Sequence, residues 1–419
     1  MDNTDNRVIT VGIFAQGKED ECMRSLDELA RLVDTAGGVV FSVLSQLKPT
    51  PDAATYIGSG KLEELADICA KNGIKKIVFD DELTPAQIRN IEDATDADVI
   101  DRSMLILDIF ALHASSAEGK IQVELAQLKY TAPRLTGKGK DMSRLGGGIG
   151  TRGPGESKLE TDRRRLFQRI AVLQKQLKEI EKNRLTTRSQ RDRSGIRKAC
   201  IVGYTNAGKS TLLNLLTDAG ILAQDKLFAT LDPTTKKMIL PSGISLLITD
   251  TVGFIRKLPH HLIHAFRSTL DEAVYSDFLI IVVDASDPEC AEQMAVTDSI
   301  LESLGASSKP RLYVFNKSDK CSCERIYDLR LMKSSLGRVV TLCAKTGGGT
   351  DELICQLEAM CRSDKTLENF LFPYNEQSAV NALFKSSEIV SKTYGDDGVH
   401  VQAWVDKKTK GMYDRFIEK

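Results

Sequence analysis

The sequence lacks the features of a membrane or secreted protein. Its most apolar run, F-L-I-I-V-V at residues 278–283, is far shorter than the roughly 20 residues that a membrane-spanning helix needs. The first residues, M-D-N-T-D-N, are polar and acidic, without the basic start and apolar stretch of a signal peptide. The nine Cys residues have no disulfide-like spacing, as is typical of reduced thiols in a cytosol. We therefore expect a cytoplasmic protein with no membrane segment.

Metal-ligand spacings are also missing. Cys321 and Cys323 form a single C-x-C with no second pair nearby, and we interpret them as loop residues. His260 and His264 stand four residues apart, but the segment H-H-L-I-H lacks the Glu of a zinc protease motif. A solvated helix face is the better interpretation of these His residues.

The net charge of −1 hides an asymmetry along the chain. Between Arg134 and Lys198 there are 19 Lys and Arg against 7 Asp and Glu, a local charge of +12 that leaves −13 for the remaining residues. A segment of this composition is suited to a polyanionic partner.

The length and the pattern of the chain indicate several domains. Residues 1–117 alternate strand and helix patterns, which predicts an α/β domain with a mostly parallel sheet. Residues 118–195 turn helical, and residues 196–363 form a second α/β pattern that indicates a wound parallel sheet. Residues 364–419 form a small α/β unit, with a helix around Val380 to Ile389 and a strand V-H-V-Q-A-W-V that contains the single Trp.

The middle segment is expected to be a helical hairpin with a Gly-rich tip. Its second helix, which we expect to begin after Ser157, has a 4-3-4-3 spacing of apolar residues, typical of a coiled-coil seam, at Leu166, Ile170, Leu173, Leu177 and Ile180. A merely amphipathic surface helix is the alternative. The Gly-rich stretch from Pro133 to Ser157 is either a disordered linker or, at the tip of a hairpin, an RNA contact through Lys138, Lys140, Arg144 and Arg152.

A phosphate-binding loop opens the second α/β domain. G-Y-T-N-A-G-K-S, from Gly203 to Ser210, follows a strand and precedes a helix, as the phosphate-loop pattern requires. Its backbone N–H groups and the helix N-terminus surround the phosphates. Lys209 reaches the terminal phosphates and Ser210 ligates Mg²⁺. Asn206 is either a loop-stabilising side chain or a ligand for K⁺.

Four further motifs follow the phosphate loop along the chain, at spacings that suit a nucleotide-binding domain. In F-A-T-L-D, Thr230 is a second magnesium ligand, and in D-T-V-G-F, Asp250 supports the metal and the Gly253 amide faces the terminal phosphate. Asp319 in N-K-S-D accepts hydrogen bonds from guanine that adenine does not offer. Cys343 begins C-A-K, where a Ser-Ala-Lys turn usually donates a backbone amide to guanine, so Cys for Ser should matter little.

We therefore predict a GTPase in which Lys209, Thr230 and Gly253 act in catalysis, and Ser210 and Thr230 bind the metal. The nucleotide-binding residues are predicted to be Gly203, Tyr204, Thr205, Asn206, Ala207, Gly208, Lys209, Ser210, Thr211, Phe228, Ala229, Thr230, Leu231, Asp232, Asp250, Thr251, Val252, Gly253, Asn316, Lys317, Ser318, Asp319, Cys343, Ala344 and Lys345. Many GTPases place a Gln after the Gly of D-x-x-G to orient the attacking water, and here that position holds Phe254.

Nearly the whole chain resembles the HflX family, ribosome-associated GTPases of the Obg-HflX group. The resemblance rests on Y-I-G-S-G-K, on S-R-L-G-G-G-I-G-T-R-G-P-G-E-S-K-L-E-T-D-R-R, on G-Y-T-N-A-G-K-S-T, on L-F-A-T-L-D-P-T and on D-T-V-G-F-I. Ser318, where Ile is commoner, and Cys343 are small departures.

The resemblance implies binding to the large (50S) ribosomal subunit, with the Gly-rich tip near the peptidyl-transferase region, and GTP-dependent splitting of stalled or idle ribosomes. Because Phe254 cannot orient water, slow hydrolysis is expected of the protein alone, with the ribosome completing the site. The alternatives are a GTPase that remodels or modifies RNA off the ribosome and a GTP-gated scaffold without catalysis. We expect a monomer.

Overall fold

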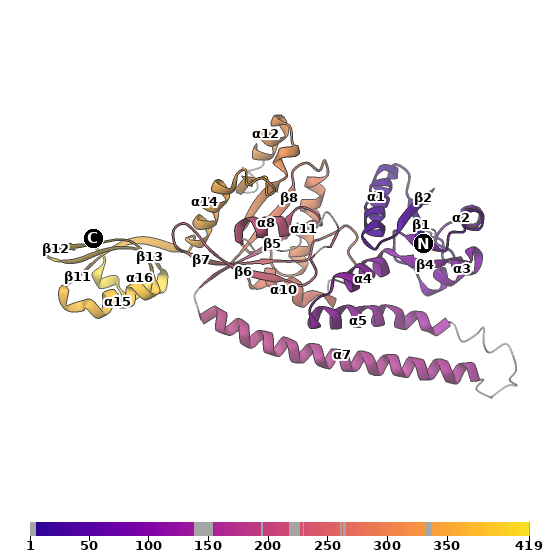
Figure 1. Cartoon of the computed structure of the whole chain (residues 1–419), viewed down its shortest axis with the longest axis horizontal. Helices are drawn as coiled ribbons and strands as arrows, with labels where there is room; N and C mark the ends of the chain where they lie inside the picture. Colours follow the sequence, from indigo (N-terminus) through magenta and orange to yellow (C-terminus); the bar gives the residue numbers. More distant parts are fainter. Residues whose placement is uncertain are drawn as a thin grey trace.

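The computed structural model describes residues 6–137, 154–193, 196–217, 227–228, 230–259, 262, 265–331 and 337–418. Ala229, His260, His264 and the four predicted RNA contacts, Lys138, Lys140, Arg144 and Arg152, lie outside these ranges. In Figure 1 the domain with the GTPase motifs lies at the centre, with the N-terminal and C-terminal domains on opposite sides and a pair of long helices below. Within the described ranges, no helix has both the length and the apolar character that a membrane crossing requires.

The N-terminal domain is a parallel sheet with helices on both faces. Its elements are β1 (Arg7–Phe14), α1 (Glu19–Thr35), β2 (Val39–Leu47), α2 (Ser59–Asn72), β3 (Lys76–Phe79), α3 (Pro85–Thr95), β4 (Asp98–Asp101) and α4 (Arg102–His113). The strand order is β2-β1-β3-β4, and every pairing is parallel, which confirms the predicted α/β type. Helix α3 begins with a capping box between Thr84 and Gln87, as Thr-Pro at this point suggests.

The middle segment forms a pair of helices. Helix α5 (Ala117–Thr131), followed by the short η1 (Ala132–Gly137), runs antiparallel to α7 (Pro154–Arg193), as Figure 1 shows. Leu173 is fully buried between the helices and Ile170 nearly so, with Leu166 and Leu177 packed against them, so the predicted seam is the contact surface. Helix α7 begins at Pro154, before the expected start after Ser157, because Pro is tolerated in the first turn of a helix.

The central domain is a wound sheet in the order β10-β9-β8-β5-β7-β6. Its elements are β5 (Arg197–Gly203), α8 (Lys209–Thr217), β6 (Thr234–Ile239), β7 (Ser245–Asp250), α10 (Arg267–Tyr275), β8 (Phe278–Asp284), α11 (Cys290–Ser303), β9 (Arg311–Asn316), η2 (Ser318–Lys320), α12 (Cys323–Leu331), β10 (Arg338–Thr341) and α14 (Thr350–Cys361). Strand β6 was not predicted. It pairs antiparallel with β7 at the sheet edge, and its sequence T-T-K-K-M-I is too polar to stand out as a core strand.

The C-terminal domain has an antiparallel sheet in the order β11-β13-β12. Its elements are β11 (Lys365–Phe372), η3 (Tyr374–Glu376), α15 (Gln377–Ser386), β12 (Glu388–Gly395), β13 (Gly398–Asp406), α16 (Lys407–Met412) and η4 (Asp414–Phe416). The predicted strand is β13. The predicted helix was too long at its end, because Ile389 belongs to β12, whose pairing with β13 outweighs local helix preference.

Candidate active site

The phosphate loop joins the end of β5 to the start of α8, at the edge of the sheet where parallel strands end. Gly208 adopts a φ of 95°, and a Cβ atom there would lie 2.2 Å from the side-chain nitrogen of Asn316. Any other residue would therefore push the loop away from β9. The loop and the base-reading end of β9 are locked together because Asn316 Nδ2 also donates to Ala207 O at 2.9 Å.

Lys209 is buried under the loop that precedes it. Its Nζ donates to Tyr204 O at 2.8 Å, and burial lowers the pKa of its ammonium to about 8. Asp250 opposes this shift. Phosphate oxygens beside Nζ would favour the charged form of Lys209. A bound anion would therefore stabilise the charged form of Lys209, and this stabilisation would favour anion binding.

The structure brings together the side chains of Ser210, Thr230 and Asp250, the three residues that the sequence predicts to hold or support the metal. Ser210 Oγ donates to Asp250 Oδ2 at 2.7 Å and lies 2.9 Å from Thr230 Oγ1, which is 3.4 Å from the same carboxylate oxygen. The other oxygen, Asp250 Oδ1, is buried with no hydrogen-bond partner among the described residues, and burial raises the pKa of this carboxyl group. Two hydroxyls around an unsatisfied carboxylate fit a small, oxygen-preferring divalent cation.

Gly253 passes close to the phosphate loop. A Cβ atom on Gly253 would lie 2.8 Å from Lys209 Nζ and 2.8 Å from Thr205 Cα. Only a residue without a side chain lets the backbone N–H approach the position of a terminal phosphate this closely. The structure thus brings Gly253 against the phosphate loop, and its contact with a terminal phosphate stays a prediction.

Phe254 is fully buried and belongs to the main hydrophobic core. Its backbone pairs with the phosphate loop, because its N–H donates to Gly203 O at 3.0 Å and its carbonyl accepts from Thr205 N at 2.7 Å. The ring has no polar atom and no access to a water molecule. Phe254 thus positions the loop through its backbone and does not replace a water-orienting Gln.

The residues two positions before and after Thr230 contact other domains, whereas Thr230 itself faces the nucleotide site. Phe228, with a φ of 56°, packs its ring edge-on against Phe110 of α4 at 4.8 Å. Asp232 accepts hydrogen bonds from Ser115 and Ser116 at the start of α5. In this structure the side chains of Phe228 and Asp232 therefore contact other domains, while Thr230 faces Ser210 and Asp250.

The base-reading residues lie at the ends of β9 and β10. Ala344 N donates to Asn316 Oδ1 at 2.9 Å, and Lys317 Nζ lies 2.7 Å from Asp284 Oδ2. Asp319 is exposed, so a guanine base could reach its carboxylate. One oxygen of this carboxylate, Oδ1, accepts a hydrogen bond from Cys343 Sγ at 3.1 Å. This hydrogen bond lowers the pKa of the Asp319 carboxyl group. The sequence interpretation gave Cys343 a backbone role only, and the structure adds this thiol contact.

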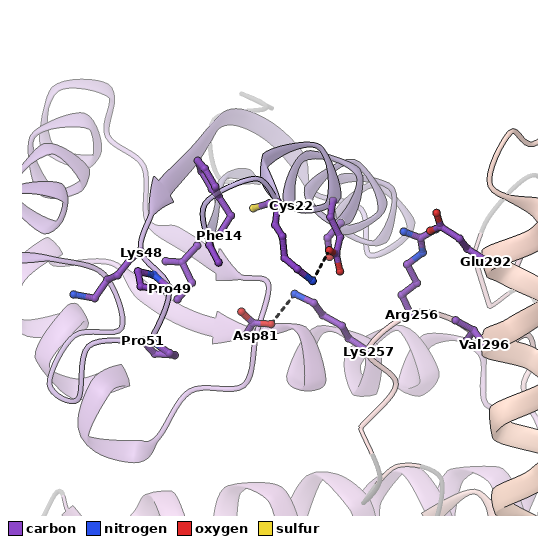
Figure 2. Close-up of a pocket in the computed structure, with 15 residues that line it drawn as sticks. Phe14, Cys22, Lys48, Pro49, Pro51, Asp81, Arg256, Lys257, Glu292 and Val296 are labelled. Carbon is purple, nitrogen blue, oxygen red and sulfur yellow. Dashed lines mark hydrogen bonds and ion pairs between the residues drawn. The ribbon is translucent and has the colours of Figure 1, made fainter.

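The loop after β7 contacts the N-terminal domain through side-chain and backbone atoms. Lys257 Nζ lies 2.5 Å from Asp80 Oδ2 and 2.7 Å from Asp81 Oδ1, and buried Arg102 donates to Arg256 O at 2.9 Å. Figure 2 shows Lys257 and Asp81 at a cavity of about 540 Å³ between the two domains. Sequence reasoning missed these contacts, because no local pattern links residues so far apart. The N-terminal domain thus holds the segment that follows Phe254.

The described residues contain no group of three or more His, Cys, Asp or Glu that could hold a metal ion. Cys321 lies in the loop after η2, whereas Cys323, interpreted from the sequence as a loop residue, begins helix α12. The site at Asp250 differs, because it has one carboxylate and two hydroxyls. This donor set is typical of a magnesium ion that also keeps water and phosphate ligands.

The phosphate loop indicates the broad class of nucleotide hydrolases. The carboxylate of Asp319 indicates that the base is guanine, because adenine offers no N–H donors at the positions that Asp319 would contact. The phosphate loop and the base-reading motif lie at the same edge of the sheet, and this combination defines a P-loop GTPase. GTPase HflX of Lacrimispora saccharolytica is 50% identical over 401 residues, covering 96% of this chain and 94% of that protein. GTPase HflX of Escherichia coli strain K12 is 38% identical, covering 91% and 89%. The chain belongs to the HflX family of GTPases, and it hydrolyses GTP.

Family models and a solved structure agree with this assignment. The model described as GTP-binding GTPase N-terminal matches residues 23–111, GTP-binding GTPase Middle Region matches residues 113–191, and 50S ribosome-binding GTPase matches residues 198–317. A crystal structure of SsGBP in complex with GDP is similar with a TM-score of 0.50 and 28% identity, covering 85% of this chain and 99% of that chain.

Proposed function

We propose that this GTPase binds the 50S ribosomal subunit and couples hydrolysis of GTP, to GDP and phosphate, to the splitting or rescue of stalled or idle 70S ribosomes. It acts as a monomer in the cytoplasm, where ribosomes are found. Its four functional parts are residues 1–117, 118–195, 196–363 and 364–419.

The observation that carries the proposal is the charge of the outer side of α7. Helix α7 packs against α5 through Ile170 and Leu173, and its Arg184 reaches Glu272 of α10, while the part of α7 turned away from these contacts is exposed. Its exposed cationic side chains are Arg163, Arg164, Arg165, Lys175, Lys178 and Lys182. Such a surface suits the phosphate backbone of structured RNA, which proteins recognise by shape and charge. The description of the matched family model, 50S ribosome-binding GTPase, also supports this partner.

In this proposal the Gly-rich segment between α5 and α7 contacts ribosomal RNA through Lys138, Lys140, Arg144 and Arg152. The long α7, of 40 residues, spans roughly 60 Å at the rise of a regular helix, so its first residue, Pro154, lies far from the junction of α7 with the GTPase domain. Arg169 and Glu124 pair across the two helices at 2.6 Å, in addition to the apolar seam between them.

Magnesium fits the site of Ser210 and Thr230, with Asp250 supporting it. The ion would neutralise charge on the terminal phosphates. Lys209 holds the same phosphates, and the Gly253 N–H donates to the terminal one. Asn206, with a φ of 61°, lies in the phosphate loop as a candidate ligand for K⁺.

In our proposal, orientation of the water that attacks GTP limits the rate of hydrolysis by the protein alone. Because the ring of Phe254 is buried in the core, the protein alone offers no side chain at the position of Gln. The ribosome completes the site in our proposal, as partner proteins do for other GTPases.

The test compares GTP turnover by the protein alone, with intact 50S subunits and with naked ribosomal RNA. We expect intact 50S subunits to stimulate turnover by at least ten-fold, and naked RNA to give little stimulation. Equal stimulation by naked RNA would favour an RNA factor acting off the ribosome. No stimulation by either would leave the GTP-gated scaffold. Light scattering of 70S ribosomes, with GTP and with GDP, tests splitting directly.

A further inference from the structure

Phe167 lies on the exposed surface of α7, the long helix along the lower border of the molecule in Figure 1. Its side chain is 50% exposed. The ring takes no part in the seam with α5, to which α7 contributes Leu166, Ile170, Leu173 and Leu177. Among the described residues, the packing of the two helices therefore gives no reason for an aromatic ring at this position.

The helix around Phe167 is cationic. From Arg163 to Lys178 the sequence R-R-R-L-F-Q-R-I-A-V-L-Q-K-Q-L-K contains six Lys and Arg and no Asp or Glu. Arg169 is paired with Glu124 on α5. Arg164 is exposed, and among the described residues it has no hydrogen bond or ion pair. This surface therefore attracts an anionic partner from outside the chain.

Four residues of the same helix surround the ring. The guanidinium carbon of Arg163, one turn before Phe167, lies 5.7 Å from the ring centroid. Arg164, Gln168 and Ala171 line an open hollow of about 630 Å³ together with Arg163 and the ring itself. Because the side chain of Ala171 is a single methyl group, it leaves the ring uncovered on the side of the following turn.

An apolar protein surface does not fit this part of α7. Phe167 and Val172 are the exposed large apolar side chains on the described part of the helix. They stand five positions apart, about 140° around the helix axis, so they form no common apolar patch. A single aromatic ring among cations instead fits a nucleotide, whose base has a flat π face and whose phosphate is an anion.

We propose that Phe167 stacks on an unpaired base of RNA, while Arg163 and Arg164 bind the phosphates next to that nucleotide. This inference rests on the proposed RNA-binding function of α7, and it adds the class of RNA that the helix recognises. In a regular duplex each base is covered by its neighbours, so the ring can stack only on a base from a loop or bulge.

The stacking site is separate from the proposed contacts of the Gly-rich segment. Phe167 stands 13 positions after Pro154, the first residue of α7, which is roughly 20 Å along a regular helix. Variants at Phe167 therefore test this site without altering Arg144 or Arg152.

The first test uses the full-length protein and two short RNA hairpins, without ribosomes. One hairpin carries the fluorescent base 2-aminopurine in a one-nucleotide bulge, and the other carries it in a base pair. We expect wild type to bind the bulged hairpin about ten-fold more tightly and to quench its fluorescence, in line with the strength of base stacking on aromatic residues. Equal affinity for the two hairpins would overturn the proposal.

Phe167→Ala should lose this preference and the quenching, while its affinity for the paired hairpin stays within about two-fold of wild type. Phe167→Tyr keeps an aromatic ring and should keep both properties, whereas Phe167→Leu keeps only apolar volume and should lose the quenching. Val172→Ala is the matched control, since it shortens the other exposed apolar side chain of α7. A preference that survives in Phe167→Ala, or that disappears equally in Val172→Ala, would show that the ring does not stack on the base.

The salt dependence separates stacking from charge. Arg164→Ala should weaken binding of both hairpins and lower the salt slope by about one, because it removes a phosphate contact. Phe167→Ala should leave the salt slope unchanged. A lower slope in Phe167→Ala would mean that the ring only positions the arginines.

Sedimentation with 50S subunits connects this site to the ribosome. We expect Phe167→Ala to bind 50S subunits about ten-fold more weakly than wild type, since one stacked base is lost. If Phe167→Ala loses 50S affinity but binds the bulged hairpin like wild type, the ring contacts a ribosomal protein and the proposal is wrong. If wild type shows the bulge preference but does not bind 50S subunits, the stacking site stands and the proposed ribosomal function fails.

Discussion

The carboxylate of Asp232 accepts hydrogen bonds from both the backbone N–H and the hydroxyl of Ser116, the N-cap residue of α5. Ser115 donates to the same carboxylate from its N–H at 2.9 Å and its hydroxyl at 2.7 Å. The fit is close, since a Cβ atom on Gly119 would lie 2.4 Å from Asp232 Oδ1. The loop that carries Thr230 is thereby tied to the helical arm.

Asp232→Asn should destabilise the protein, because an amide keeps one acceptor and places N–H groups against the serine donors. Hydrogen bonds to charged groups are worth roughly 1.5–3 kcal/mol, and we expect a loss of about that size in the free energy of unfolding. Urea denaturation measures it, with Asp93→Asn, an exposed residue of α3, as the control. Equal midpoints for the two variants would mean that Asp232 adds nothing to stability.

Phe254→Ala tests the role of the buried ring. Because the ring makes no hydrogen bond to water, the intrinsic rate of GTP hydrolysis should stay within a few-fold of wild type at equal nucleotide occupancy. Stability should fall by roughly 3–5 kcal/mol, since the cavity left in the core is large. A collapse of the intrinsic rate with intact nucleotide affinity would make the ring part of the catalytic apparatus.

The same assay in potassium and in sodium examines Asn206. If Asn206 binds a potassium ion, wild type should hydrolyse GTP faster in potassium, and Asn206→Ala should remove the difference. Equal rates of wild type in both salts would leave Asn206 as a loop-stabilising residue.

Asp319→Asn should exchange guanine for xanthine specificity, since an acceptor at the purine 2-position becomes a donor. Titration with fluorescent GDP and XDP measures the change. Cys343→Ser serves as the matched control, because a hydroxyl in place of the thiol still donates to Asp319. We expect this variant to bind GDP as tightly as wild type. Unaltered GDP affinity in Asp319→Asn would remove Asp319 from the base site.

Replacement of Arg144 and Arg152 by Ala should weaken binding to 50S subunits and reduce its dependence on salt, since each removes a candidate phosphate contact. Sedimentation with 50S subunits at several salt concentrations measures both effects. Intrinsic GTP hydrolysis is the internal control and should not change. An unaffected salt slope would show that the Gly-rich segment is not the ribosomal contact.

His400 predicts a pH effect in the C-terminal domain. Its ring lies 2.9 Å from Asp397 Oδ1 and 2.6 Å from Glu418 Oε1, and these hydrogen bonds raise the pKa of His400. The stabilising contribution should be complete below the ordinary His pKa of about 6.5 and should be lost as the pH rises through the raised folded value. NMR titration measures this pKa in wild type. Urea midpoints of wild type and His400→Gln should converge at high pH, and a constant gap would contradict the assignment.

Local sequence determined the identity of the site. G-Y-T-N-A-G-K-S, Thr230, Asp250 and N-K-S-D each follow or precede a strand. Parallel strands end at one edge of the sheet, so the side chains of Ser210, Thr230 and Asp250 lie close together. The apolar spacing likewise predicted the seam of α5 and α7 through Ile170 and Leu173. These features follow from periodicity and chain direction, which are local properties.

The tertiary structure decided what surrounds the site. Nothing in the sequence tied Asp232 to Ser116, or Lys257 to Asp80, because these pairs come from different domains with separate patterns. Strand β6 was missed for a related reason, since an edge strand with one solvated face needs little apolar character. A short motif is enough to predict the chemistry of a loop, because its residues are neighbours in the sequence. Contacts between domains depend on whole surfaces, whose residues come together only when the chain has folded.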